Sequence, residues 1–500
     1  MIGMSESAAH GATRQLISPY EYIAGHPLRQ LFLIFLFSLP LVNPYVHGDG
    51  VGYYAYARAP LVQHDLKFEA DWRHGNEVFA ENHLQSNGQL LPNQYTETGH
   101  VGNIFTVGPA ILWGPFLAFA HAAVLTIDHF GGAIAADGFS LPYRLAMALG
   151  TAFYGFLSLF LSFLVARKYT DEHWAFLATL GIWTASSLPV YMYFNPSWSH
   201  AHSAFVVALF FWYWDRTRPE RTTQQWIIMG LIAGLMLDTY FPNGIFLLIP
   251  LIETIRRYFR LLGHGAGVTA FGEFGKNALF IFAIIIAVIP TLLTRLIVFG
   301  GLFRFGVYGV LPWNWSAPNW KSVLVSSDHG LLTWTPILAL AILGLALAER
   351  RAREIAAYAG VAVLSFYYLI ASYPYWDGMS SFGNRFFVSL TPMFVLGLAL
   401  FLQRLGRLPF LARRRDVLAL CLIAGFAVWN AGFVIQWGTQ MIPARGPISW
   451  GEMIHNQGMK VPQQIGGELQ SYFLGRKAMM QHIEEQDIKK LQSQPEQGVR

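Results

Sequence analysis

The chain has 500 residues, of which 54% are hydrophobic and only 13% are charged. Soluble domains carry about 25% charged residues, so this composition excludes a soluble multidomain protein and indicates a polytopic membrane protein with one domain. The net charge of +5 does not indicate a nucleic-acid partner, because many basic residues lie in loops beside apolar runs. The single cysteine, Cys421, excludes an intramolecular disulfide and a cysteine-rich metal site.

Apolar runs recur along the chain and predict eleven membrane-spanning helices. The first, residues 28–46, follows a polar segment over residues 1–27 and has no small-residue cleavage site after it, so we expect a retained anchor. The other ten cover residues 141–166, 174–190, 201–214, 226–237, 241–255, 277–299, 331–348, 355–372, 386–402 and 417–435.

A long semi-polar region, residues 47–140, separates the first two spans. It is rich in acids and poor in Lys and Arg, so we expect it outside the cytoplasm. Its one apolar piece, residues 101–127, contains Gly108-Pro109 and Gly114-Pro115, which we expect to break a continuous helix. We interpret this piece as helices lying at, or dipping into, the outer face.

Arginine-rich loops set the predicted topology. Residues 167–168, 216–221, 256–276, 350–353 and 404–415 hold many Arg and Lys residues, which predicts that these five loops and residues 1–27 lie in the cytoplasm. The transmembrane domain then covers residues 28–436. The same rule places the tail, residues 437–500, on the outer face, with a surface helix followed by disorder over residues 475–500.

One stretch of the outer region stands out as a site. Asp49 lies in His47-Gly-Asp-Gly-Val-Gly-Tyr53, directly after the first span, where an acid at membrane depth is costly and usually functional. Three nearby glycines let the backbone turn sharply and approach a ligand closely. The alternative is that Asp49 is a turn residue where the chain leaves the membrane.

Two histidines, His200 and His202, open another span after Asn195. At positions i and i+2 they point to different sides of a helix, which suits hydrogen bonding in a pocket better than a shared metal ion. Packing is the alternative.

Two further outer loops carry polar side chains at the mouth of a span. Asp328 and His329 precede Gly330, where ligand contact and helix capping are equally good interpretations. Trp313 belongs to a tryptophan-rich loop that suits stacking on sugars, with interfacial anchoring as the alternative. Asp377 precedes Asn384-Arg385, and the planar guanidinium of Arg385 suits a phosphate, with snorkelling to lipid headgroups as the alternative.

The unusual polar residues therefore collect on the predicted outer face. The candidate substrate-binding set is Tyr53, His100, Asn103, Asn195, His200, His202, Asp328, His329, Asp377, Asn384 and Trp313. No nucleotide-cradling motif GxxxxGK[ST] and no hydrolase motif GxSxG occurs, and no HExxH or DxD motif occurs on this face.

With these residues in place, the chain resembles the GT-C class of polyprenyl-phosphate-sugar-dependent glycosyltransferases, especially bacterial relatives of protein O-mannosyltransferases and of the lipid A aminoarabinose transferase. The resemblance is architectural over most of residues 28–435. It rests on Asp49 after the first span, the long first outer loop, the segment Val107-Gly-Pro-Ala-Ile-Leu-Trp-Gly-Pro, and Gly-Asn-Arg385-Phe-Phe-Val-Ser-Leu-Thr-Pro. Asp49-Gly50 stands where the O-mannosyltransferases have Asp-Glu, and their His-Pro-Pro pattern is absent, so the class is supported more than any member.

The resemblance implies an all-α membrane fold with about eleven transmembrane helices. It also implies transfer of a sugar from a polyprenyl-phosphate donor to a hydroxyl or amine of a lipid, glycan or protein acceptor, on the outer face of the inner membrane and among its lipids. Asp49 would be the general base, and Arg385, with Arg304 or Lys321, would neutralise the departing phosphate. No cofactor or metal need be invoked, although a divalent cation stays open.

Two alternatives remain. A transporter or flippase of lipid-linked sugars would also need a polar cavity and anion-binding arginines, but such proteins usually show repeated halves, which this sequence lacks. A lipid-linked oligosaccharide polymerase or ligase is the other alternative.

Overall fold

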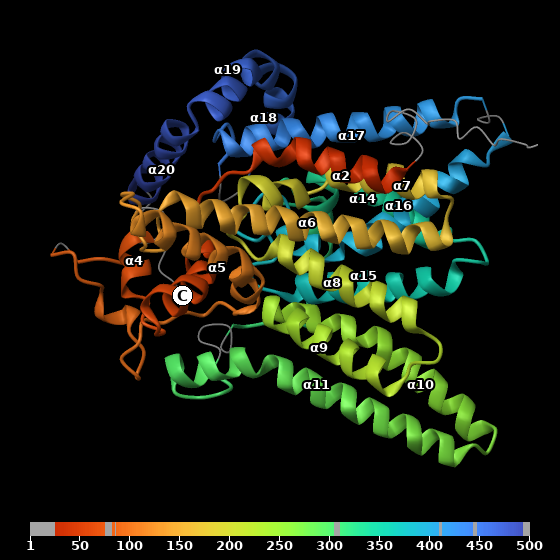
Figure 1. Ribbon diagram of the computed structural model, residues 1–500. Coiled ribbons are helices and arrows are strands. Elements are labelled where there is room, and N and C mark those ends of the chain that lie inside the picture. The colour runs from red at the N-terminus through yellow and green to blue at the C-terminus, as the bar shows by residue number, and fades with distance from the viewer. Residues whose placement is uncertain are drawn as a thin grey trace, which may run out of the picture.

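The computed structural model describes residues 26–75, 83–85, 87–304, 311–409, 413–443 and 448–493. These residues form helices and two isolated β-bridges, and contain no β-strand. The long helices run side by side and form one bundle (Figure 1). The all-α prediction is therefore confirmed.

Every predicted span coincides with a helix. The helices at these positions are α2 (Pro27–Ser38), α6 (Leu141–Tyr169), α7 (Glu172–Ala185), α8 (His200–Thr217), α9 (Thr223–Thr239), α10 (Leu248–Gly263), α11 (Gly267–Phe299), α14 (Ile337–Ala346), α15 (Arg353–Ser372), α16 (Thr391–Gly406) and α17 (Arg415–Gly438). Within the described ranges, six helical stretches are long and apolar enough to cross a membrane, namely α5 (Gly108–His129), α6, α11, α15, α17 and the stretch from Arg385 to Gly406. The chain is a multi-pass membrane protein.

The prediction that Gly-Pro pairs interrupt a helix over residues 101–127 is wrong at Gly114-Pro115, whereas Gly108-Pro109 stands where the helix begins. Helix α5 runs without interruption and contains Pro115. Pro109 lies in its first turn, where the missing N–H would have no helical partner anyway, so it favours the helix start. Pro115 costs one internal hydrogen bond, a loss that membrane helices tolerate when neighbouring helices pack closely. Helix α5 packs closely on α6 near this proline, because the buried Trp113 indole of α5 donates to Thr151 of α6 at 2.8 Å.

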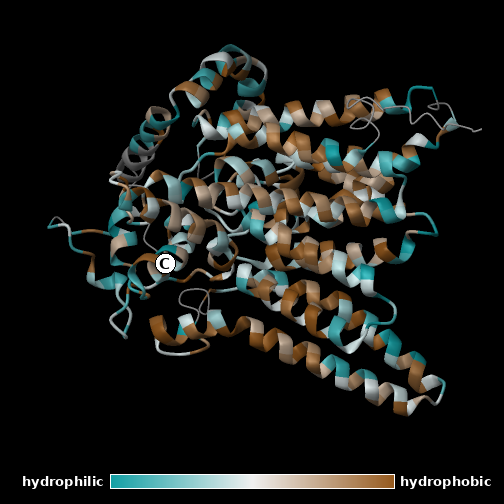
Figure 2. Cartoon of the chain, in the orientation of Figure 1, coloured by the Kyte–Doolittle hydropathy of each residue, from teal (hydrophilic) through white to brown (hydrophobic). Residues whose placement is uncertain are grey.

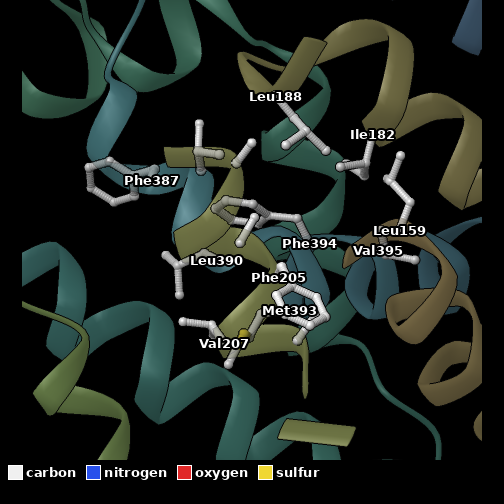
Figure 3. Close-up of a cluster of buried hydrophobic side chains, with 14 of the residues drawn as sticks. Leu159, Ile182, Leu188, Phe205, Val207, Phe387, Leu390, Met393, Phe394 and Val395 are labelled. Carbon is white, nitrogen blue, oxygen red and sulfur yellow. The ribbon is translucent and has the colours of Figure 1, made fainter. Parts of the chain in front are cut away.

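Helix α16 lies at the centre of the bundle, with nearly all of its side chains buried. Figure 3 shows its residues Met393, Phe394 and Val395 packed among Ile182 of α7 and Phe205 of α8. In contrast, α11 exposes large aliphatic and aromatic side chains along its length, as expected for a helix that faces lipid (Figure 2).

The five arginine-rich loops meet at one end of the bundle, which we call the arginine end (Figure 1). Ion pairs join segments from different loops: Lys168–Asp215 at 2.8 Å, Arg218–Glu354 at 3.5 Å, Arg221–Glu253 at 2.7 Å, His173–Asp416 at 3.2 Å and Arg407–Glu349. The structure thus brings together the loops that the sequence assigned to one side.

The other end, which we call the α3 end, carries α3 (Asp49–Arg58), α4 (Glu69–Gly75) and α5. The C-terminal helices α18 (Trp450–His455), α19 (Val461–Leu474) and α20 (Arg476–Ser493) also attach there. Tyr472 donates to the carbonyl of Leu41 at 2.6 Å, and Arg476 donates to the carbonyl of Pro40 at 2.8 Å. The tail therefore holds the segment that leads from the first span into α3.

Candidate functional site

Asp49 and Arg385 form an ion pair at the α3 end. Nη1 of Arg385 donates to Oδ2 of Asp49 at 2.6 Å. Asp49 is the first residue of α3, and Arg385 begins η7 (Arg385–Leu390), the short helix that leads into α16. The Asp49 side chain is 34% exposed and the Arg385 side chain only 8%. A solute can therefore reach the carboxylate, whereas the protein encloses the guanidinium.

Trp198 contacts Arg385 and the loop that precedes Asp49. The guanidinium carbon of Arg385 lies 4.5 Å from the centre of the Trp198 ring, a cation–π contact. The indole N–H donates to the carbonyl of His47 at 3.0 Å, two residues before the acid. Trp198 therefore fixes the loop that presents the carboxylate and the cation that it meets.

The glycines around Asp49 are required by close packing inside the protein. Gly48 has a φ of +53°, and a Cβ there would lie 3.1 Å from the Trp198 ring. A Cβ at Gly50 would lie 2.0 Å from Oγ of Ser197. The sharp turn expected from the sequence is present at Gly48, but the close approach at Gly50 is to Ser197.

His47 was not singled out from the sequence, although it stands two residues before Asp49. Its Nε2 is 2.5 Å from Oδ1 of Asn195, which fixes Nε2 as the protonated nitrogen. Burial lowers the pKa of His47, against the opposing effects of the Asn195 hydrogen bond and the Asp49 charge. The imidazole is therefore neutral near pH 7 and braces Asn195 beside the acid.

The two histidines of α8 face different neighbours. His200 is buried among aromatic rings, with the Tyr191 ring centre at 4.8 Å and the Phe386 ring centre at 6.5 Å. Phe386 also lies under the Arg385 guanidinium, at 5.5 Å. His202 packs edge-on against Trp113, at 5.0 Å. The structure thus places His200 near the pair and His202 against α5.

Tyr53 and Asn103 support α3 from within. The Tyr53 hydroxyl accepts a hydrogen bond from Ser199 at 3.0 Å, and burial raises the pKa of Tyr53. The Asn103 amide donates to the carbonyl of Gly52 at 2.8 Å, and Asn103 is fully buried. Both side chains are engaged by the protein, so they position α3.

Asp328, His329 and Asp377 form a second polar group at the α3 end. One potential ligand atom from each lies within 4.8 Å of the others. Nδ1 of His329 is 2.9 Å from the Asp377 carbonyl oxygen and 3.7 Å from Oδ1 of Asp328. Burial, together with the Asp377 charge, raises the pKa of Asp328 to about 6, and burial lowers the pKa of His329 to about 4.

This second group adjoins Arg385. A Cβ on Gly378, the residue after Asp377, would lie 3.3 Å from Cγ and 3.4 Å from Nε of Arg385. The Asn384 amide donates to the carbonyl of Trp376 at 2.9 Å and so fixes the same loop. Three sequence candidates from two distant segments are thus collected next to the guanidinium.

The remaining candidates lie in other settings. Arg304 pairs with Glu97 at 2.7 Å on the surface, and Lys321 is exposed on α12 (Trp320–Val325). His100 contacts the Thr98 hydroxyl at 3.0 Å in the loop that meets the end of α11. Trp313 stacks on Trp315 with ring centres 5.0 Å apart. None of these described contacts is with Asp49 or Arg385.

The sequence analysis also missed Arg295, which lies inside the apolar run of α11. Its side chain is fully buried and donates to the carbonyls of Asn103, Ile104 and Phe105 at 3.0, 2.6 and 2.9 Å. An arginine within a span is costly, and that cost is the signal that could have identified it. It clamps the loop that packs against α3.

No protein-family model and no curated protein sequence matches the chain. Among solved structures, the chain is similar to ArnT from Cupriavidus metallidurans in the apo state, with 14% identity, a TM-score of 0.45, and coverage of 83% of this chain and 72% of that one. The same protein bound to undecaprenyl phosphate matches with 14% identity, a TM-score of 0.45, and coverage of 84% and 72%. The archaeal oligosaccharyltransferase AglB from Archaeoglobus fulgidus, in complex with an inhibitory peptide and a dolichol-phosphate, matches with 13% identity, a TM-score of 0.41, and coverage of 87% and 54%. Both proteins are of the GT-C class that the sequence resembles.

Proposed function

We propose that this protein is a membrane glycosyltransferase that moves a sugar from a polyprenyl-phosphate donor to a hydroxyl or amine of a lipid, glycan or protein acceptor. The observation that carries the proposal is the pair itself: a carboxylate open to solvent, fixed 2.6 Å from an enclosed guanidinium at one end of a membrane bundle. The reaction needs a base for the acceptor proton and a cation for the departing phosphate. Asp49 supplies the first and Arg385 the second.

The bond changes follow from this assignment. The acceptor oxygen or nitrogen attacks the anomeric carbon of the sugar, and its proton passes to the Asp49 carboxylate. The bond between the anomeric carbon and the phosphate oxygen breaks, and polyprenyl phosphate leaves with the electron pair. Arg385 stabilises the negative charge on this leaving group, since a guanidinium can donate two hydrogen bonds to a phosphate.

The arginine end gives the proposed orientation. Arginine-rich loops favour the cytoplasm, so the α3 end, including the tail of residues 437–500, is proposed to face the outside of the inner membrane. A donor lipid would then lie in the membrane among the helices, with its sugar reaching Asp49.

The test uses purified full-length protein and labelled polyprenyl-phosphate sugars with a panel of acceptors. Asp49→Asn keeps the shape of the side chain but cannot take a proton, so single-turnover transfer should fall by about 10²- to 10⁴-fold while donor binding persists. The matched control is Asp128→Asn, an exposed acid near the end of α5, which should transfer at the parental rate.

Transfer by Asp49→Asn at close to the parental rate would make Asp49 a turn residue and contradict the proposal. So would a parental protein that transports a lipid-linked sugar across vesicles without breaking its phosphate bond.

A further inference from the structure

The group of Asp328, His329 and Asp377 is built from two segments that meet only in the fold. Asp328 and His329 lie before α13 (Leu331–Trp334), and Asp377 lies before η7. The His329 side chain is completely buried, and its backbone has a φ of +56°, which a residue with a Cβ rarely adopts. The fold therefore directs this imidazole toward the two acids at a conformational cost.

Two buried atoms of the group lack a hydrogen-bonding partner among the described residues, Oδ1 of Asp328 and Nε2 of His329. Nδ1 of His329 lies 2.9 Å from the Asp377 carbonyl oxygen, which can only accept a hydrogen bond, so Nδ1 carries the proton and Nε2 keeps its lone pair for a ligand. Oδ1 of Asp328 lies 3.7 Å from the same Nδ1. A buried polar atom without a partner costs free energy, and two carboxylates this close repel each other. A cation between them would remove both costs.

We propose that Asp328, His329 and Asp377 bind one divalent transition-metal ion, of the Mn²⁺ or Zn²⁺ kind. Two carboxylates and one imidazole are a mixed oxygen and nitrogen set, which suits these ions better than Mg²⁺ or Ca²⁺. Three donor atoms spread evenly around such an ion are at most about 3.8 Å apart, because each bond is about 2.0–2.2 Å long. The ligand atoms lie within 4.8 Å of one another, so they need to close by at most about 1 Å.

Three protein ligands leave coordination positions open, as in metal sites that contact a substrate. The Asp377 loop lies against Arg385, so an ion bound there would lie near a donor phosphate held by the guanidinium. This role rests on the proposed function: the ion and Arg385 together neutralise the departing phosphate. It replaces the sequence-based expectation that no metal need be invoked.

The binding test uses metal-stripped full-length protein in detergent, titrated with Mn²⁺ and followed by electron paramagnetic resonance of the free ion. We expect one Mn²⁺ per chain, with affinity at least about tenfold weaker in His329→Gln and in Asp377→Asn, where a charged or imidazole ligand is lost. Asp128→Asn is the matched control and should bind as the parent does. A parent that binds no Mn²⁺, or parental affinity in both ligand variants, would overturn the proposal.

A second measurement does not depend on the variants folding. Pulsed electron paramagnetic resonance of the parental Mn²⁺ complex should show coupling to an imidazole nitrogen. Absence of that coupling would remove His329 from the site and overturn the proposal.

The role is tested separately from the site. Chelation of the metal should weaken binding of undecaprenyl phosphate by about tenfold or more, and Mn²⁺ should restore it. Unchanged phosphate binding would overturn the role. Asp49→Asn should bind Mn²⁺ as the parent does, so failure of the Asp49 assignment and failure of the metal site give different results.

Discussion

Nη1 of Arg385 lies 2.6 Å from Oδ2 of Asp49, although 336 residues separate the two in the chain. The acid belongs to the first loop after the first span, and the guanidinium belongs to the segment that leads into the central helix α16. The pair therefore ties the loop after the first span to the most buried part of the bundle. Its geometry leads to the predictions that follow.

Arg385→Lys should weaken donor binding although it keeps the positive charge. A lysine ammonium cannot make two parallel hydrogen bonds to a phosphate and loses the flat contact with Trp198. A hydrogen bond to a charged group is worth about 1.5–3 kcal/mol, so the donor Kd should rise by roughly 10- to 100-fold. Arg167→Lys, at the arginine end, is the control. Unchanged donor affinity in Arg385→Lys would leave Arg385 as an anchor for lipid headgroups.

Trp198 offers two graded substitutions. Trp198→Phe keeps an aromatic face under Arg385 but loses the hydrogen bond to the His47 carbonyl. Such a bond is worth about 1 kcal/mol, so we expect turnover to fall roughly fivefold. Trp198→Leu also loses the cation–π contact and should lower turnover by roughly 10- to 100-fold. Trp450→Phe, on exposed α18, is the control. Equal effects of Phe and Leu would show that the aromatic face does not matter.

Gly344→Ala should destabilise the bundle. A Cβ there would lie 1.9 Å from the carbonyl oxygen of Gly397, where α14 and α16 cross closely. Overpacking of this kind costs about 1–3 kcal/mol, so the midpoint of thermal unfolding in detergent should fall. Gly360→Ala in α15 meets no atom within 4 Å and serves as the control. A midpoint equal to that of the control would mean that the two helices are less tightly packed than described.

The orientation can be tested with single cysteines on a Cys421→Ser background. A cysteine at Glu97, exposed at the α3 end, should react with an impermeant reagent from outside the cell, and a cysteine at Arg216 only from the cytoplasmic side. Glu77 would be another probe of the same loop but lies outside the described residues. The reverse labelling pattern would place the proposed site in the cytoplasm.

The sequence was sufficient to locate the helices but not the contacts between them. Apolar periodicity locates each span, because membrane depth requires about 20 apolar residues whatever their partners. The error in α5 arose because Pro115 was expected to break the helix, and it lies inside the helix without breaking it. Asp49 and Arg385 were each recognised from local chemistry. Their contact could not be, since sequence carries no direct record of a pairing across 336 residues.

The same reason explains the missed residues. Trp198 was not singled out from the sequence, and only the fold places its ring under Arg385. The meeting of His329 with Asp377 also depends on the fold, since 48 residues separate them. Arg295 differs, because a charge within an apolar run was visible without any structure.

The contact between the C-terminal helices and the end of the first span can form only late in the synthesis of the chain. Arg476 holds the Pro40 carbonyl, 436 residues earlier in the chain. At about 5–20 residues per second, a ribosome takes roughly 20–90 s to make that stretch. For that period the segment leading to Asp49 has left the ribosome without its final restraint. A nascent chain halted before α20 would therefore already contain both members of the Asp49–Arg385 pair but would hold the first of them loosely.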